Sequence, residues 1–181
     1  EPGARIAHGL RETVSRERLR ESALSGEIEG LLNWVTVAPG DVLFTPAGVI
    51  HAIGAGIALC EIQQNSDVTY RLYDYGRPRE LHIDRGVEVS RLEPGPARTT
   101  PVLLDQGREL LVRCEHFEVE RVRLEAAGTC QFAGGVILIV LDGTGMVEGT
   151  RYAPGDAWLI PTGQPCEVRA DATSTLLTAR F

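Results

Sequence analysis

One phrase occurs twice in this chain of 181 residues, and it constrains the fold more than any other feature. The first copy runs from Ala38-Pro39-Gly40-Asp41 through Pro46-Ala47-Gly48 to His51, and the second from Ala153-Pro154-Gly155-Asp156 through Pro161-Thr162-Gly163 to Cys166. In each copy Pro-Gly-Asp predicts a tight turn, a short apolar strand follows, and Pro-x-Gly turns the chain again. The equal spacing predicts two copies of one structural unit, and only the first copy ends in a histidine.

Short apolar runs between Gly and Pro turns make up most of the remaining sequence. They predict a first group of strands at residues 42–44, 56–62 and 68–73, and a second group at residues 110–112, 117–124, 136–141, 157–160 and 175–179. Many short strands with regular turns are typical of all-β barrels and sandwiches. We therefore predict an all-β fold made of two β-barrel units.

Residues 15–35 are the one segment with helical character. Ser15 is placed to cap a helix that carries Leu19, Ala23 and Leu24 on one side, and a break at Ser25-Gly26 precedes a second short helix. We expect this segment to be a surface insertion.

Three prolines, Pro94, Pro96 and Pro101, mark the boundary between the two units, because proline cannot join the ladder of a central strand. The predicted units are residues 1–92 and 100–181.

Composition excludes several classes of protein. The formal net charge of −7 argues against a nucleic-acid partner, and all 18 basic residues are Arg, so no lysine of this chain can act as a base. No run approaches the about 20 apolar residues of a membrane span. The four cysteines are scattered, which is typical of reduced thiols in a cytoplasmic protein. Because the chain starts at Glu1 without a methionine, we expect a fragment or a processed chain.

The spacing G-x5-P-x-G-x2-H of the first copy resembles the second metal-binding motif of the cupin superfamily, whose members are small antiparallel jelly-roll barrels. The first copy supplies all four residues of this motif, namely Gly40, Pro46, Gly48 and His51. The resemblance implies that His51 points into the barrel and binds a divalent metal. Cys166 replaces the histidine in the second copy, and we expect it to have a structural role.

A longer run around and after His51 is more specific. Residues 46–56 and 61–77 are similar to the carboxyl-terminal half of short bacterial type I mannose-6-phosphate isomerases. The resemblance covers residues 1–92 well, whereas residues 100–181 fit mainly in position and plan. It implies a catalytic first cupin barrel, incomplete if some of its strands are missing here, and a degenerate second barrel.

The resemblance also implies one zinc ion in the first barrel, with His51 as a ligand. The other ligands of the family come from an H-x-H or Q-x-H segment and a later Glu, and this chain contains no H-x-H. His8, His82 and His116 are isolated in the sequence, and we expect them at the surface or in turns. Because a catalytic zinc site has three protein ligands, the remaining ligands are expected outside this chain.

Polar residues after His51 supply the other candidate site groups. On a strand over residues 67–73, Asp67 and Arg71 share one face, and Glu61 lies on the preceding predicted strand. The residues alone leave two interpretations open, a polar barrel interior or a solvent-exposed face with ion pairs. The resemblance favours the interior, with Arg71 stabilising an enediolate or assisting proton transfer, and with Glu61 and Asp67 as acid/base groups or as groups that orient sugar hydroxyls.

The predicted reaction is the interconversion of mannose 6-phosphate and fructose 6-phosphate by zinc-assisted proton transfer through an enediol. The expected partner is a phosphosugar, without nucleic acid or membrane, and pairing between chains through exposed barrel edges is an open possibility. The alternative function is a non-catalytic cupin module that binds a sugar or another protein, because the other metal ligands are missing. An iron-dependent cupin oxygenase is disfavoured by the long match over residues 61–76.

Overall fold

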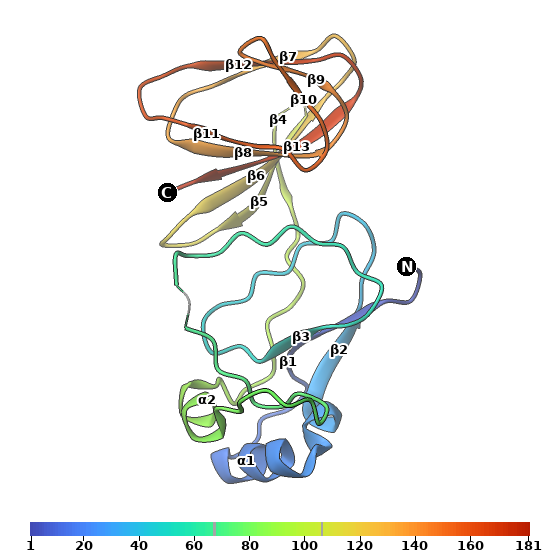
Figure 1. Ribbon diagram of the computed structural model, residues 1–181, viewed down its shortest axis with the longest axis vertical. Helices are drawn as coiled ribbons and strands as arrows, with labels where there is room; N and C mark the ends of the chain where they lie inside the picture. Colours follow the sequence, from blue (N-terminus) through green and yellow to red (C-terminus); the bar gives the residue numbers. More distant parts are fainter. Residues whose placement is uncertain (67, 106) are drawn as a thin grey trace. The chain divides into compact units, whose positions relative to one another are not determined.

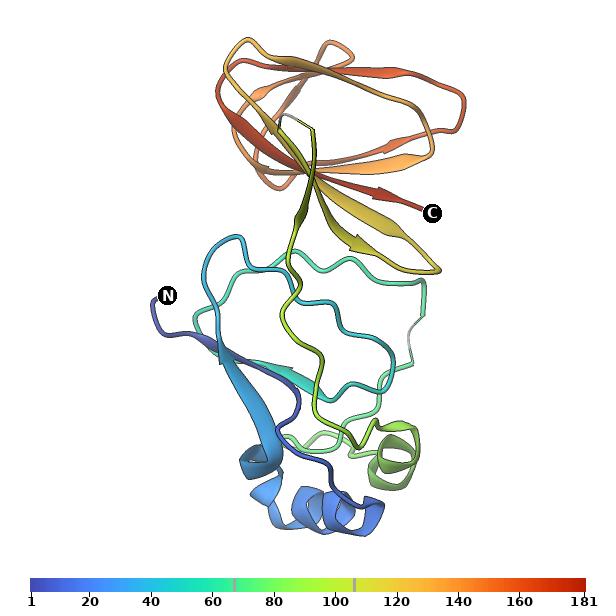
Figure 2. The same ribbon diagram turned by 180° about the vertical axis from the view of Figure 1, so that it is seen from behind.

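The chain is described by a computed structural model that covers residues 1–66, 68–105 and 107–181. It divides into two compact units, Glu1–Arg98 and Thr99–Phe181 (Figures 1 and 2). Antiparallel strands dominate the described part, and two α-helices and one short 3-10 helix interrupt them there. The predicted all-β class is therefore confirmed. None of the described helices is long and apolar enough to cross a membrane.

The first unit contains a three-stranded antiparallel sheet with the strand order β2-β1-β3. These strands are β1 (Arg5–Leu10), β2 (Leu32–Thr36) and β3 (His51–Ile53). In the central strand β1, Ala7 pairs with Trp34 and with Ala52, whereas His8 pairs with His51. Paired residues of neighbouring strands point to the same face of a sheet. One face therefore carries Ala7, Trp34 and Ala52, and the other carries His8 and His51.

The Ala7 face of this sheet packs on an apolar core. Its buried members are Ala7, Leu10, Leu31 and Leu32, with Val14, Trp34, Ile50 and Ala52 packed against them. Burial of each large apolar side chain contributes about 1.5–3 kcal/mol to folding. The core thus occupies one face of the sheet and leaves the two histidines on the opposite face.

Helix α1 (Arg16–Ser25) begins as predicted, because the Ser15 hydroxyl accepts a hydrogen bond of 3.1 Å from the Arg18 amide. Leu19 and Ala23 are buried, whereas Leu24, predicted on the same side, is 59% exposed. The 3-10 helix η1 (Glu27–Leu31) follows at the break near Gly26.

The packing of α1 corrects the expected surface insertion. Leu19 and Ala23 form one buried cluster with Ile28, with Leu72 and with Val87 of helix α2 (Ile83–Val89). Figures 1 and 2 both show α1 and α2 side by side. The helical segment is therefore part of the core of the first unit. The predicted second helix is also wrong beyond residue 31, because residues 32–35 lie in β2.

Two long segments of the first unit, residues 37–50 and the described part of 54–82, have no regular secondary structure. They contain the first predicted group of strands, and that prediction is wrong. A strand needs a neighbour to satisfy its backbone groups. In the described chain, no backbone hydrogen bond joins residues 57–63 to another segment. The apolar run over residues 57–60 is present in the sequence, but a neighbouring strand that pairs with it is not found in the described chain.

The second unit has two antiparallel sheets. The larger one has the order β11-β8-β13-β6-β5-β4, with β4 (Val102–Asp105), β5 (Arg108–Arg113), β6 (Glu118–Leu124), β8 (Val136–Asp142), β11 (Ala157–Ile160) and β13 (Ser174–Arg180). The smaller one has the order β10-β9-β12-β7, with β7 (Thr129–Phe132), β9 (Gly145–Val147), β10 (Thr150–Tyr152) and β12 (Cys166–Ala170). Each strand of the second predicted group overlaps one of these strands, so that group is confirmed.

Both sheets of the second unit contribute to one core. Leu138 and Leu176 of the larger sheet pack in the same cluster as Phe132, Val147 and Val168 of the smaller one. Inward and outward residues alternate along β8, as expected for a strand with one buried face. The two sheets therefore face each other, in the manner of a jelly roll.

The two copies of the repeated phrase form the same turns. The Asp41 and Asp156 carboxylates accept hydrogen bonds of 2.8 Å from the amides of Ala38 and Ala153, respectively. In the second turn of each copy, the Pro46 and Pro161 carbonyls accept bonds of 3.1 and 3.3 Å from the amide three residues later. The duplicated turns are therefore confirmed, whereas the strand predicted between them forms only in the second copy, as β11.

Candidate functional site

His51 is the first residue of β3 and follows the second turn of the repeated phrase. Its Nδ1 lies 3.0 Å from the Val49 carbonyl oxygen. Because a carbonyl can only accept, the ring hydrogen of this bond is on Nδ1, and Nε2 of the neutral ring keeps its lone pair. The residue is exposed. Metal-binding histidines use this arrangement, with one nitrogen bonded to a backbone carbonyl and the other free for the metal.

The turn that leads to His51 is attached to the chain after α2. The Gly48 carbonyl accepts a bond of 2.8 Å from the Arg91 amide, and the Ala47 carbonyl accepts one of 3.0 Å from Arg91 Nε. Gly48 has a φ of +84°, and a Cβ at this position would lie 2.6 Å from the Val89 carbonyl oxygen. Glycine is therefore required here for both the backbone conformation and the close approach.

His8 was expected at the surface or in a turn, and that expectation is wrong, because this histidine is buried in a strand. It lies in the central strand β1, is 1% exposed and pairs with His51 in register. Its Nε2 lies 3.2 Å from the Thr45 hydroxyl, and its Nδ1 has no hydrogen-bond partner. Burial lowers the pKa of His8, and the Phe44 carbonyl partly offsets this effect. The apolar neighbours of His8 in the sequence are the signal that could have indicated a buried strand.

Arg71 is held at its backbone by His82. The Arg71 amide donates a bond of 3.1 Å to His82 Nδ1, and its carbonyl accepts one of 2.8 Å from the His82 amide. The guanidinium Nη1 donates a bond of 3.2 Å to the Glu80 carbonyl. An arginine side chain has five N–H donors, so most of them stay available for a ligand. His82 itself precedes α2 and packs its ring 5.9 Å from the Tyr70 ring.

The structure describes one of the other two predicted site residues. Glu61 is exposed in a segment without regular strand structure. Asp67 lies outside the described residues. Among the residues that the structure describes, no hydrogen bond or ion pair joins His51, Glu61 and Arg71. The structure therefore locates three of the four predicted residues in the first unit without bringing them into contact.

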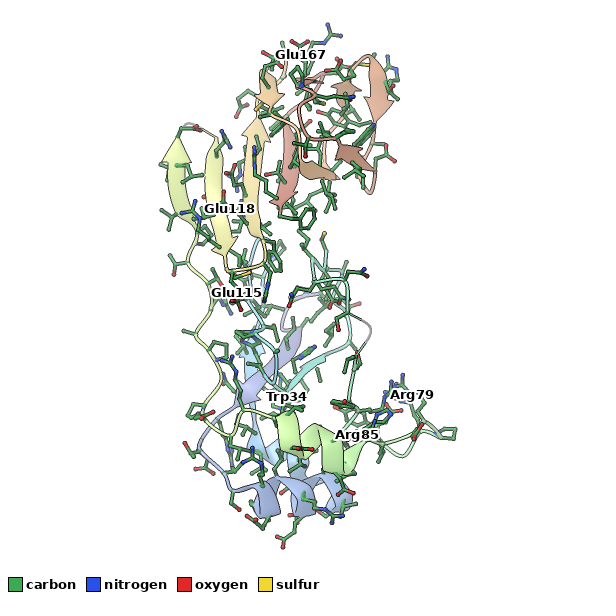
Figure 3. The ribbon with its side chains drawn as sticks, turned by 90° about the vertical axis from the view of Figure 1, so that its left-hand side faces the viewer. Trp34, Arg79, Arg85, Glu115, Glu118 and Glu167 are labelled. Atoms are coloured by element: carbon green, nitrogen blue, oxygen red, sulfur yellow. The ribbon has the colours of Figure 1, made fainter. Side chains whose placement is uncertain are left out.

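An ion-pair cluster follows Arg71, and the sequence analysis did not single out its central carboxylate. The Asp74 side chain is 6% exposed and is paired with Arg79, while Arg77 Nη1 lies 3.9 Å from Asp74 Oδ1. Arg77 also stacks its guanidinium 5.6 Å from the Tyr75 ring centre. The bond from Arg79 lowers the pKa of Asp74. Figure 3 shows Arg79 on the loop that leads into α2.

The residues that the structure describes contain no group of three or more His, Cys, Asp or Glu side chains that could hold a metal ion. His51 fits the chemistry of one zinc ligand, but a catalytic zinc site needs three protein ligands. Cys166, its counterpart in the second unit, is 3% exposed and packs in the apolar core. The described side chains thus form no complete metal site.

Comparison with known proteins identifies relatives of this chain. No protein-family model matches the chain. Mannose-6-phosphate isomerase ManA of Bacillus subtilis is 38% identical over 175 residues, which are 88% of this chain and 55% of that protein. The crystal structure of the mannose 6-phosphate isomerase of B. subtilis superposes with a TM-score of 0.84 at 29% identity, over 100% of this chain and 62% of that one.

A more distant structure shows the same fold with a ligand. The mannose 6-phosphate isomerase of Salmonella typhimurium, solved with the substrate fructose 6-phosphate and zinc, is 21% identical with a TM-score of 0.66. The superposition covers 92% of this chain and 49% of that protein.

The paired antiparallel sheets and the repeated turn define an all-β protein of the class that the sequence predicts. Within this class, the chain is a homologue of the mannose-6-phosphate isomerases. It spans about half the length of the relatives that it matches.

Proposed function

We propose that this chain contributes to a zinc-dependent aldose–ketose isomerase that interconverts mannose 6-phosphate and fructose 6-phosphate. The observation that supports this most is the 38% identity with the B. subtilis isomerase over 175 residues, a match that extends over nearly all of this chain. The reaction moves a proton between C1 and C2 of the sugar through an enediol, so it needs a base, an acid and a group that stabilises the oxyanion.

His51 is the residue of this chain that would hold the zinc ion. Its Nδ1 is engaged by the Val49 carbonyl, which leaves Nε2 as the ligand atom. A bound zinc ion would polarise the sugar carbonyl as a Lewis acid. The further ligands would lie outside this chain, in agreement with the missing H-x-H segment.

Arg71 would stabilise the negative charge of the enediolate. Its guanidinium stays charged throughout the physiological pH range and has N–H donors beyond the one bonded to the Glu80 carbonyl. Because His82 fixes the Arg71 backbone on both sides, the guanidinium starts from a defined position. Glu61 and Asp67 remain proposals for acid/base catalysis or for contacts with sugar hydroxyls.

The test is turnover of the full natural protein with mannose 6-phosphate, measured with a coupled assay. We expect Arg71→Ala to lower kcat by about 100-fold or more, because a preorganised charge opposite an oxyanion is lost. We expect His51→Ala to lower both zinc content and kcat. Arg85→Ala and His116→Ala are matched controls, since both residues are exposed and lie outside the proposed site. Near-normal turnover of Arg71→Ala would exclude the role proposed for this residue.

A second candidate function is a non-catalytic cupin module that binds a sugar or another protein. It is favoured because the described residues contain no group of three or more side chains that could hold a metal ion. Metal analysis and the isomerase assay on the full natural protein distinguish the two, because stoichiometric zinc with turnover excludes the module. A cytoplasmic location and assembly of several copies through exposed barrel edges also remain predictions.

A further inference from the structure

One residue, His8, contacts both ends of the loop that carries His51. This loop spans residues 45–51 and contains the second turn of the first repeat copy. His8 reaches its first residue through the contact of 3.2 Å between Nε2 and the Thr45 hydroxyl. Its backbone pairs in register with the last residue, His51. Strand β1 thus fixes the loop at its beginning through a side chain and at its end through the sheet.

The strand is coupled to the loop at a further point. The Gly9 amide donates a bond of 2.7 Å to the carbonyl of Ile50, the residue before His51. Inside the loop, the Val49 amide bonds to the Pro46 carbonyl at 3.1 Å, and the Val49 carbonyl accepts the bond from His51 Nδ1. A displacement of Thr45 would therefore be transmitted to the carbonyl that orients the His51 ring.

Packing alone does not account for an imidazole at position 8. The side chain is 1% exposed, and its Nδ1 has no hydrogen-bond partner. A buried polar atom without a partner is unfavourable, and a phenylalanine would fill similar space without that cost. The contact with Thr45 is a specific interaction that the imidazole provides and an apolar ring would lack, beside the effect of the Phe44 and Pro96 carbonyls on the ring.

We propose that His8 is a positioning residue, which holds the loop of residues 45–51 in the conformation that leaves Nε2 of His51 free for a metal ion. This inference depends on the proposed role of His51 as a zinc ligand. His8 does not itself contact the metal or the substrate. It acts through Thr45 and through the strand pair with His51, in the way that outer-shell partners of metal ligands fix ligand orientation.

The test measures zinc affinity in competition with a chromophoric chelator. It compares the full natural protein with three single variants, one double variant and one control variant. His8→Phe keeps the ring size and removes the contact with Thr45, Thr45→Val removes the hydroxyl and keeps the shape, and His8→Gln retains a hydrogen-bonding group. We expect His8→Phe and Thr45→Val to weaken zinc binding by about 10-fold to 100-fold. We expect the double variant to be no weaker than either single one, and His8→Gln to recover most of the loss. His116→Phe, an exposed histidine of the second unit, should have no effect.

A second measurement tests the role of His8 without relying on zinc binding. Amide hydrogen exchange at Val49 should accelerate about 10-fold in His8→Phe and in Thr45→Val, but not in His8→Gln, while denaturant unfolding shows that each variant is folded. The proposal would be overturned if His8→Phe and Thr45→Val both kept the wild-type zinc affinity and the wild-type exchange rate at Val49. If His8→Phe does not fold, Thr45→Val alone decides.

The same measurements separate this inference from the proposed function. A protein that binds zinc with the expected variant effects but has no isomerase activity supports the positioning role and contradicts the isomerase. A protein that binds no zinc contradicts the proposed metal, and the exchange at Val49 then decides whether His8 holds the loop.

Discussion

Asp74 accepts two hydrogen bonds from the guanidinium of Arg79, one of them from Nε to Oδ2 at 2.5 Å. The carboxylate is almost covered, whereas the arginine side chain is about half exposed. This pair closes the loop that follows Arg71, the residue proposed to stabilise the enediolate. Two parallel bonds between a guanidinium and a carboxylate fix geometry more tightly than a single contact does.

The Asp74–Arg79 pair should make the first unit sensitive to acid. Because the pKa of Asp74 is lowered in the folded state, its contribution to stability is present above the ordinary aspartate pKa of about 3.9 and is lost as the pH falls through the lowered value. We expect Arg79→Gln to be less stable than the wild type at neutral pH, with a difference that vanishes in strong acid. Urea unfolding over a pH series measures this. Arg77→Gln, whose guanidinium is 3.9 Å away, is the matched control and should show a smaller difference. A difference for Arg79→Gln that is the same at every pH would contradict the prediction.

Gly9 should not tolerate a side chain. It has a φ of +75°, and a Cβ there would lie 2.2 Å from the Gly95 Cα. Gly76 has a similar φ of +72° with no atom within 4 Å, so it isolates the cost of the backbone conformation. We expect Gly76→Ala to lower the free energy of unfolding by about 1–2 kcal/mol because of the backbone conformation alone. Gly9→Ala should lower it by about 1–3 kcal/mol more, because the added Cβ also overpacks the contact with Gly95. Chemical denaturation measures the free energy of unfolding of both variants. An equal loss of stability in the two variants would show that the backbones at Gly9 and Gly95 can move apart.

The first turn of the repeat should depend on its aspartate. In the second unit the Asp156 carboxylate accepts a bond of 2.8 Å from the Ala153 amide. We expect Asp156→Ala to destabilise the protein by about 1 kcal/mol, the usual value of such a bond, and to lower its unfolding temperature. Asp156→Asn keeps an acceptor oxygen at the same position and serves as the control. Equal melting temperatures of the alanine and asparagine variants would indicate that the bond contributes nothing.

The four cysteines should differ in reactivity with a thiol reagent such as Ellman's reagent. Cys60 is exposed, whereas Cys166 is buried, and partial burial raises the pKa of both thiols. Because the reagent must reach the sulfur, we expect Cys60 to react at least about 10-fold faster than Cys166 in the folded protein. The variant Cys60→Ser should lose the fast phase, and denaturant should expose Cys166. A fast phase that survives in Cys60→Ser would assign it to another cysteine.

Several features could be read from the sequence because they depend on neighbouring residues. The Ser15 cap, the two turns of each repeat copy and the strands of the second unit belong to this class. In the second unit, the predicted strands lie next to other strands and pair with them, so the predicted and observed strands agree. In the first unit, the apolar run within residues 56–62 does not form a strand, because no neighbouring segment of the described chain pairs with it.

The candidate site could be predicted only where it depends on residues that are close in the sequence. His51 follows from a motif of fixed spacing, and its free Nε2 follows from the local bond to Val49. His8 could not be identified in this way, because it lies more than 40 positions before His51 and only the pairing of β1 with β3 brings the two together. The Asp74–Arg79 pair was likewise not anticipated, since many arginines follow Arg71 and the sequence does not select one of them.

By itself, the sequence determined the all-β class, the duplicated turns and the histidine that distinguishes one copy from the other. These are short-range properties, set by the φ preferences of proline and glycine and by hydrogen bonds that close within a few residues. The tertiary structure decided which predicted strands form, that α1 belongs to a core, and that a second histidine lies opposite His51. Those outcomes depend on contacts between segments distant in the sequence, and such contacts exist only where the chain brings two partners together.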